Sequence, residues 1–319
     1  MLRYIIKRIL WMIPIVLGVA IIVFTLMNFC PGDPASIILG SSATESDLKA
    51  MRNELGLNNS YVERLGTFLY NTFIRFDFGK SWITRTSIKA AILERLPRTM
   101  LLTLTTLSLS IVIGITLGII AAINQGKWKD NLCMAFALMG VSVPDFWLAL
   151  LLIILFSVKL GWLPAMGIGG LQYYILPALS GCMGGIATLA RQTRSSMLDV
   201  IRADYITTAR SKGVPEFSVI TRHALKNAFI PIITIIGTHF GKMLGGAMVI
   251  ETIFAIPGMG SYIVTAVNSR DYPVVQVGAI FLAIVFSICM LGVDLIYAAV
   301  DPRIKAQYGR KSRKVKVNA

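Results

Sequence analysis

Four ionisable side chains other than cysteine and tyrosine stand inside long apolar blocks of this sequence: Asp145, His239 and Lys242 near mid-block, and Asp294 closer to the end of its block. A charge at such a position is costly unless it reaches water or an opposite charge. A lysine and a carboxylate there could pair with each other or line a polar pathway. The lysine could instead extend along apolar surface and place its ammonium at the outer membrane interface. The sequence leaves both interpretations open.

The motifs of soluble enzymes are missing from the sequence. Gly79-Lys80-Ser81 resembles the end of a phosphate-binding loop, but such a loop needs a glycine where Ile74 stands. The two histidines, His223 and His239, show no metal-binding spacing, and no Ser-His-Asp or Gly-x-Ser-x-Gly pattern occurs. We therefore expect no catalytic residues, no metal site and no cofactor in this chain.

The elements that carry these residues follow from composition. The 319 residues are 55% hydrophobic and 15% charged, and the mean hydropathy is +0.70. A soluble domain would carry about 25% charged residues. Long apolar blocks alternate with short charged ones, which is typical of a helical membrane protein. The net charge of +15 lies in the flanks and loops, so it indicates membrane topology and a lipid bilayer partner, and no nucleic acid.

About six segments are long and apolar enough to span a membrane as helices. A backbone in lipid must satisfy its own hydrogen bonds, so the predicted fold class is an all-α integral membrane protein. The predicted spans cover residues 9–29, 99–123, 132–158, 175–189, 228–250 and 274–300.

Lysine and arginine in the short connections predict the orientation. With the N-terminus inside, the inner segments 1–8, 124–131, 190–227 and 301–319 hold 19 Lys and Arg residues. The short outer loops hold only Lys159 and Arg270. The chain is therefore predicted to be a multi-pass protein of the cell membrane with both termini in the cytoplasm.

The long outer segment after the first span predicts a small extracytoplasmic subdomain. The sequence Pro31-Gly32-Asp33-Pro34 turns the chain. A short helix is expected over 47–55 and ends at Gly56. Ser60 can cap a second helix that runs to about Arg75. One face of that helix is apolar, formed by Tyr61, Leu65, Phe68, Leu69 and Phe73.

The fifth predicted span has two distinct faces. Gly237, Gly241 and Gly245 recur every four residues and form a smooth stripe that lets another helix approach closely. His239 and Lys242 lie roughly 100–160° away from the centre of that stripe. In straight spans with about 1.5 Å rise per residue, Lys242 and Asp145 would each lie about 20 Å from the inner membrane surface. We therefore hypothesise that Asp145 pairs with Lys242.

The inner segment 190–227 is long for a connection between spans. Residues 198–210 have helix-forming composition, and Gly213 stands where that helix would stop. Val214 and Pro215 would then start a second short helix. Such a projecting helix with small side chains suits docking into a cleft of a partner, and the alternative is an ordinary solvated loop.

The stretch from Asp204 to Gly213 resembles the "EAA" loop of ABC importer permeases, which couples the membrane subunit to the ATPase. Thr207-Thr208-Ala209 stands at the E-A-A place, and Gly213 matches the glycine. His223, Leu225 and Lys226 stand where the loop has Ile, Leu and Pro. The resemblance implies a coupling segment over 195–226 that includes Asp204 and Tyr205.

Further stretches resemble the B-type permease of dipeptide, oligopeptide and nickel importers, and they follow the family's order along nearly the whole chain. They are Met1-Leu2-Arg3-Tyr4-Ile5, the turn at 31–34, Gly161-Trp162-Leu163-Pro164-Ala165, Arg194-Ser195-Ser196-Met197-Leu198, Glu251-Thr252-Ile253-Phe254, Pro257-Gly258-Met259-Gly260, Arg270-Asp271-Tyr272-Pro273 and Asp301-Pro302-Arg303.

This resemblance implies the type I ABC importer fold, called MetI-like, and a division of the chain. Residues 1–30 would hold the N-terminal end and first helix, 31–96 the extracytoplasmic subdomain, 97–300 the permease domain and 301–319 a basic cytoplasmic tail. A second homologous permease, two cytoplasmic ATPases that bind ATP and Mg²⁺, and an external substrate-binding protein would be the partners.

The substrate implied by the resemblance is a di- or oligopeptide. Nickel or a metal chelate is the alternative, because the stretch from Trp162 to Gly167 looks like the nickel branch of the family. An ATP-independent secondary transporter or channel is a more distant alternative, and uptake without the partner ATPases would favour it.

Overall fold

The computed structural model describes residues 2–40 and 42–300, with side chains over 5–40 and 42–296. Helices dominate this part of the chain, and its only β contact is an isolated bridge between Lys80 and Ser87. The chain forms two compact units. The larger unit holds residues up to 6, 100–256 and 288 onward, and the smaller unit holds 7–99 and 257–287. The predicted basic tail, 301–319, lies outside the described residues.

Four helices are long and apolar enough to cross a membrane without interruption. They are α1 (Leu2–Phe29), α5 (Ile88–Ile123), α12 (Leu225–Ile253) and α14 (Tyr272–Val300). They confirm the first, second, fifth and sixth predicted spans. Helix α5 starts 11 residues before the predicted span and contains Pro97. Its first turns carry Lys89, Glu94, Arg95 and Arg98 and precede the apolar stretch.

The third and fourth predicted spans are bent rather than straight. The third consists of α6 (Trp128–Ser142), α7 (Asp145–Leu152) and the π-helix η1 (Ile153–Lys159), with a bend of 96°. The fourth consists of α8 (Gln172–Gly181) and α9 (Met183–Ile201), with a bend of 56°. If each bent pair is one span, the total is up to six, which agrees with the expected all-α membrane fold.

The bend in the third span has a local cause. Val143 and Pro144 are extended, with ψ values of 123° and 136°. Proline has no amide hydrogen and disfavours helical geometry in the residue before it. The assumption of a straight helix over 132–158 was therefore wrong, and the depth calculated for Asp145 does not hold. Asp145 is instead the first residue of a new helix.

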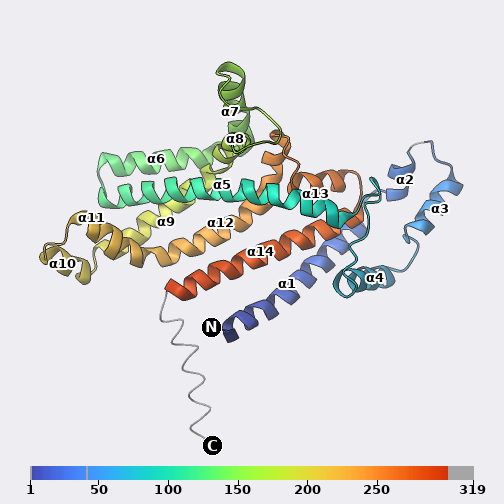
Figure 1. Ribbon diagram of the computed structural model, residues 1–319, viewed down its shortest axis with the longest axis horizontal. Coiled ribbons are helices and arrows are strands. Elements are labelled where there is room, and N and C mark those ends of the chain that lie inside the picture. Colours follow the sequence, from blue (N-terminus) through green and yellow to red (C-terminus); the bar gives the residue numbers. More distant parts are fainter. Residues whose placement is uncertain (1, 41, 301–319) are drawn as a thin grey trace, which may run out of the picture. The chain divides into compact units, whose positions relative to one another are not determined.

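The larger unit is built around α9, which packs against α6 and α12, while α7 packs against α8 and α12 (Figure 1). Two glycines of α5 allow it to approach α9 closely. A Cβ atom on Gly114 would lie 3.0 Å from the Ile186 carbonyl oxygen, and one on Gly118 would lie 2.7 Å from the Ala190 carbonyl oxygen. Because backbone atoms cannot move aside, side chains larger than hydrogen are excluded there.

We expect Gly118→Ala to destabilise the protein by about 1–3 kcal/mol, since an added methyl group would overpack this contact. A lower apparent melting temperature of the purified protein in detergent would measure the effect. Gly18→Ala in α1 is the matched control, because a Cβ there meets nothing within 4 Å. Equal melting temperatures for the two variants would contradict the close contact.

The smaller unit contains three short helices between α1 and α5: α2 (Pro34–Leu39), α3 (Glu45–Glu54) and α4 (Tyr61–Phe73). The two expected helices, α3 and α4, are confirmed. Gly56 ends α3 with a φ of +66°, and the Ser60 hydroxyl accepts from the Glu63 amide at 3.3 Å. Helix α2 was not predicted. Asp33 caps it and pairs with Arg52 at 2.8 Å, which joins α2 to α3.

The predicted apolar face of α4 is partly buried. Its side chains Phe68, Leu69 and Phe73 pack against a cluster formed by Val16, Ala20 and Ile280. The unit also contains α13 (Met259–Asn268) and, shortly after it, the buried Asp271. Asp271 accepts hydrogen bonds from the Ser81 hydroxyl and, at 3.0 Å, from the Trp82 amide. These contacts fix the 77–87 segment on α14. The domain boundaries drawn from the sequence stay predictions.

Candidate functional site

The larger unit holds a cavity of about 150 Å³ to which α5, α7, α8, α9 and α12 contribute. It brings together three of the ionisable residues singled out in the sequence, Asp145, His239 and Lys242. The other lining residues are small, apolar or hydroxyl-bearing: Leu102, Thr103, Thr106, Gly181, Gly184, Met243, Gly246, Ala247 and Ile250. The cavity is thus a polar site within a hydrophobic helix bundle.

The charged side chains reach the cavity from different elements. Asp145 opens α7 directly after the proline break, and Lys242 lies in the middle of α12. Both residues are exposed in the isolated chain. Among the ion pairs of the described residues, none joins Asp145 to Lys242. The two side chains line one cavity, and their pairing stays a prediction.

His239 is held against α9 by a glycine. A Cβ atom on Gly185 would collide with the Nε2 atom of His239 and with the Ser110 hydroxyl. Nε2 is buried and has no hydrogen-bond partner among the described residues. An unpaired buried polar atom costs about 1–3 kcal/mol. His239 also lines the cavity, while its Nε2 atom is enclosed on the side of Gly185.

The glycines of the predicted stripe on α12 differ in how closely other side chains approach them. A Cβ atom on Gly237 would lie 2.8 Å from a methyl group of Val293 in α14, whereas one on Gly245 would meet nothing within 4 Å. The role of Gly241 in packing stays a prediction. The sequence analysis missed the closer contacts of Gly114 and Gly118, although their Gly-x-x-x-Gly spacing is the usual signal of a helix interface.

The inner segment contains a separate short helix, α10 (Asp204–Ser211). The helix stop predicted at Gly213 is confirmed. Gly213 has a φ of +74°, and its amide donates to the Arg210 carbonyl at 2.9 Å. The Val214 amide donates to the Ala209 carbonyl at 3.3 Å. These two bonds form a Schellman motif, which needs a left-handed residue at the position of Gly213.

Helix α10 has a buried face and an exposed face. Ile206 and Ala209 are buried in a cluster with Met197, Val219 and Ala224. Asp204, Tyr205, Thr207, Thr208 and Arg210 are exposed. The chain then continues through α11 (Glu216–Ser218) and the π-helix η2 (Val219–Ala224) into α12, and Figure 1 shows α10 and α11 together at one end of α9 and α12. Helix α10 is therefore held to its neighbours by its buried face, and its other face is exposed.

An ion pair that the sequence analysis did not identify joins α6 to α9 near this end. Asp130 is 2% exposed, and its two carboxylate oxygens accept from the Arg194 guanidinium at 2.7 Å each. Asp130 also accepts from the Gly126 amide at 3.0 Å. This bidentate geometry is the strong form of the interaction, so it fixes α6 on the helix that leads into α10.

Asp130→Asn is expected to lower the stability by about 3 kcal/mol, because it leaves the Arg194 charge without its partner. Thermal unfolding of the purified protein in detergent would show a clearly lower melting temperature. Asp199→Asn is the control, since Asp199 lies on α9, the helix that also carries Arg194, and its side chain is exposed. A melting temperature unchanged in both variants would show that the ion pair contributes nothing.

Comparison with known proteins decides the family. Residues 114–306 match the model of the family described as binding-protein-dependent transport system inner membrane component. Residues 1–103 match the N-terminal model of the same transport systems. The chain belongs to this family. The resemblance seen in the sequence is thereby confirmed, and the chain is an integral membrane permease of an ABC importer.

Relatives of this permease match it over nearly its full length. A peptide transport system permease protein of Brucella abortus (strain 2308) is 45% identical over 313 residues, covering 96% of this chain and 99% of the relative. The glutathione transport system permease protein GsiC of Escherichia coli (strain K12) is 41% identical over 305 residues, with coverage of 96% and 99%.

A solved structure supports the fold of the permease. A chain from inward-facing conformations of the MetNI methionine ABC transporter matches with a TM-score of 0.54 at 16% identity. The match covers 67% of this chain and 97% of that chain. The MetI-like fold inferred from the resemblance is therefore confirmed.

Proposed function

We propose that this permease is one of two membrane subunits of an ATP-driven importer for short peptides. The observation that carries the proposal is the similarity, over 96% of the chain, to permeases named for peptide and for glutathione transport. Glutathione is itself a tripeptide, so both names point to the same substrate class. Both names favour peptides over metal chelates.

The size of the cavity supports a second permease subunit. Sites for small molecules usually have volumes of about 300–1,000 Å³. The cavity around Lys242 measures about 150 Å³, too small for a peptide. Asp145 and Lys242 are exposed in the isolated chain, so a homologous subunit facing them would complete the wall of a larger pathway. His239 would contribute part of its imidazole ring to that wall.

Helix α10 is proposed to couple this pathway to cytoplasmic ATPases, which bind ATP and Mg²⁺ in place of this chain. Its exposed face carries Asp204, Tyr205, Thr207 and Thr208. Its buried face packs on the residues that begin α12. A force applied to α10 would therefore move α12, on which His239 and Lys242 lie, and shift the permease between two conformations. This arrangement requires both termini to be in the cytoplasm.

Uptake assays test the proposal. In cells of the source organism, deletion of the gene is expected to abolish uptake of labelled di- and tripeptides supplied outside, while ⁶³Ni²⁺ uptake stays unchanged. Deletion of the neighbouring ATPase genes should have the same effect. Loss of nickel uptake with intact peptide uptake would favour the metal-chelate alternative. Peptide uptake that persists without the ATPases would favour a secondary transporter.

A further inference from the structure

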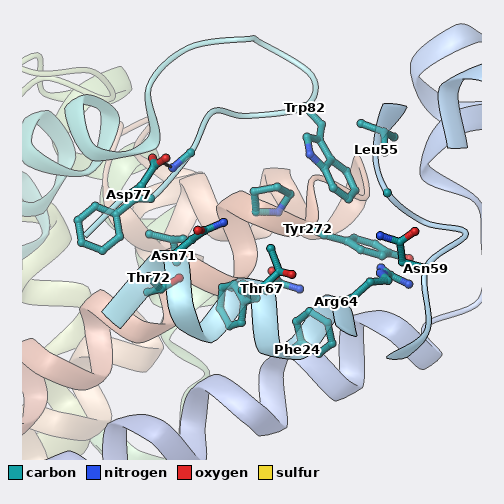
Figure 2. A pocket seen from close by; sticks show the side chains of 17 residues that line it. Phe24, Leu55, Asn59, Arg64, Thr67, Asn71, Thr72, Asp77, Trp82 and Tyr272 are labelled. Carbon is teal, nitrogen blue, oxygen red and sulfur yellow. Dashed lines mark hydrogen bonds between the residues drawn. The ribbon is translucent and has the colours of Figure 1, made fainter. Parts of the chain in front are cut away.

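The smaller unit contains a second cavity, of about 290 Å³. It lies between α4, the turn at 55–59, the segment 77–82 and the start of α14 (Figure 2). Its volume is close to the lower limit for small-molecule sites, which is about 300 Å³. None of the residues that we propose for transport lines this cavity. The proposed transport function therefore does not account for this cavity.

Three polar side chains in the wall of this cavity are more than nine-tenths buried. Thr72 is 4% exposed, Tyr272 is 5% exposed and Gln276 is 7% exposed. Within the described part of the chain, no hydrogen bond is made by any of these three side chains. None of their polar atoms is among the fully enclosed side-chain atoms that lack a partner, so these groups are open to the cavity, where water or a ligand can reach them. A cavity wall with three such groups suits a polar ligand.

Arg64 brings a positive charge to the same cavity. Its side chain is partly buried, donates one hydrogen bond to the Asn28 side chain at 2.8 Å, and lies 6.0 Å from the centre of the Phe24 ring. No carboxylate among the described residues forms an ion pair with it. Burial lowers the pKa of Arg64 from its ordinary value, as expected for a guanidinium without a counter-charge. The remaining donors of its planar fork suit a carboxylate.

The rest of the wall is aromatic. The rings of Trp82 and Tyr272 lie 5.5 Å apart, and those of Phe24 and Phe68 lie 5.4 Å apart. In Figure 2, Arg64, Asn59 and Tyr272 gather at one end of the cavity and Asp77 lies at the other. The cavity thus offers a cation at one end, amide and hydroxyl groups, and apolar surface for a side chain.

We propose that this cavity binds a small molecule with a carboxylate next to an amide, such as the C-terminal end of a short peptide. Arg64 holds the carboxylate, and the Gln276 amide and the Tyr272 hydroxyl pair with the adjacent peptide group. Thr72 lies toward the opposite end of the cavity, near Asp77 (Figure 2), where its hydroxyl can bind a more distant polar group of the ligand. The aromatic rings enclose the side chain. The site goes beyond the proposed transport function, because it is separate from the cavity around Lys242 and its occupancy is measured without uptake.

Binding of N-acetylleucine to the full-length permease tests this assignment. The permease is purified in lipid nanodiscs with the subunits that co-purify, and affinity is measured by titration calorimetry. N-acetylleucinamide, which lacks the carboxylate, should bind at least about tenfold more weakly, since a hydrogen bond to a charged group is lost. Equal binding of the amide would overturn the proposal, as would no binding of N-acetylleucine. Displacement by an equal concentration of inorganic phosphate would show a general anion site and also overturn it.

Four variants locate the site. Arg64→Gln should weaken N-acetylleucine binding at least about tenfold, because the charge-assisted bonds are lost. Gln276→Met keeps the volume of the side chain and should weaken binding several-fold. Arg75→Gln is the matched control, since Arg75 is exposed just beyond α4 and does not line the cavity. Lys242→Met should also leave binding unchanged. Binding lost in Lys242→Met but kept in Arg64→Gln would place the ligand in the transport pathway and overturn the assignment.

Discussion

Gly213→Val is expected to reduce peptide uptake by at least about tenfold, while the permease still inserts into the membrane and assembles. Gly213 has a φ of +74°, a conformation that costs other residues about 1–2 kcal/mol and a β-branched residue more. Space is not the obstacle, because a Cβ atom there meets nothing within 4 Å. The strain falls on the Schellman motif that ends α10. The last turn of α10 therefore loosens, and its exposed face no longer transmits movement to α12.

The measurement is a comparison of ATP hydrolysis and peptide uptake in reconstituted proteoliposomes. We expect uptake to fall by at least about tenfold, which equals about 1.4 kcal/mol of coupling, while ATP hydrolysis continues. Gly161→Val is the matched control, since Gly161 also has a positive φ, +65°, and open space around it. If both variants transport normally, α10 has no coupling role. If both lose membrane insertion, the strain acts on folding alone.

Lys242→Met is expected to impair transport far more than assembly. Methionine keeps most of the apolar length of the side chain, so packing of α12 is preserved while the charge is removed from the cavity. Loss of a charged contact to the solute or to Asp145 should reduce uptake by about tenfold or more. Uptake of a labelled tripeptide, divided by the amount of permease in the membrane, measures the effect.

Lys159→Met is the control for this prediction, because Lys159 is exposed at the end of η1 and away from the cavity residues. Asp145→Asn and the double variant complete a thermodynamic cycle. If Asp145 and Lys242 act as a pair, the double variant should be no worse than either single one. Full uptake in Lys242→Met would instead support a lysine that only reaches the outer interface.

The unbroken spans, the helix caps and the helix stop at Gly213 could be predicted because each depends only on residues that are close together in the sequence. Apolar length alone indicates a span, so α1, α12 and α14 were predictable. Ser60 and Gly56 carry their signals in their own residue types. The same holds for Gly213, whose lack of a Cβ permits the left-handed conformation.

Contacts between distant segments could not be predicted in the same way. The pairing of Asp130 with Arg194 joins residues 64 positions apart, and nothing in either local sequence selects the other. The proline break at Pro144 was visible in the sequence, but the size of the bend, 96°, depends on how α7 packs against α8 and α12. The depth assigned to Asp145 was wrong for that reason.

The sequence by itself determined that this protein is a helical membrane permease of a known family, because hydrophobic length, loop charge and motif order are properties of the linear chain. Only the tertiary structure decided which polar groups meet. It brought Asp145 to the cavity of His239 and Lys242, and it gathered Arg64, Thr72 and Gln276 around the second cavity. The physical reason is that burial and hydrogen-bond pairing depend on every neighbouring helix, and these neighbours come together only when the chain folds.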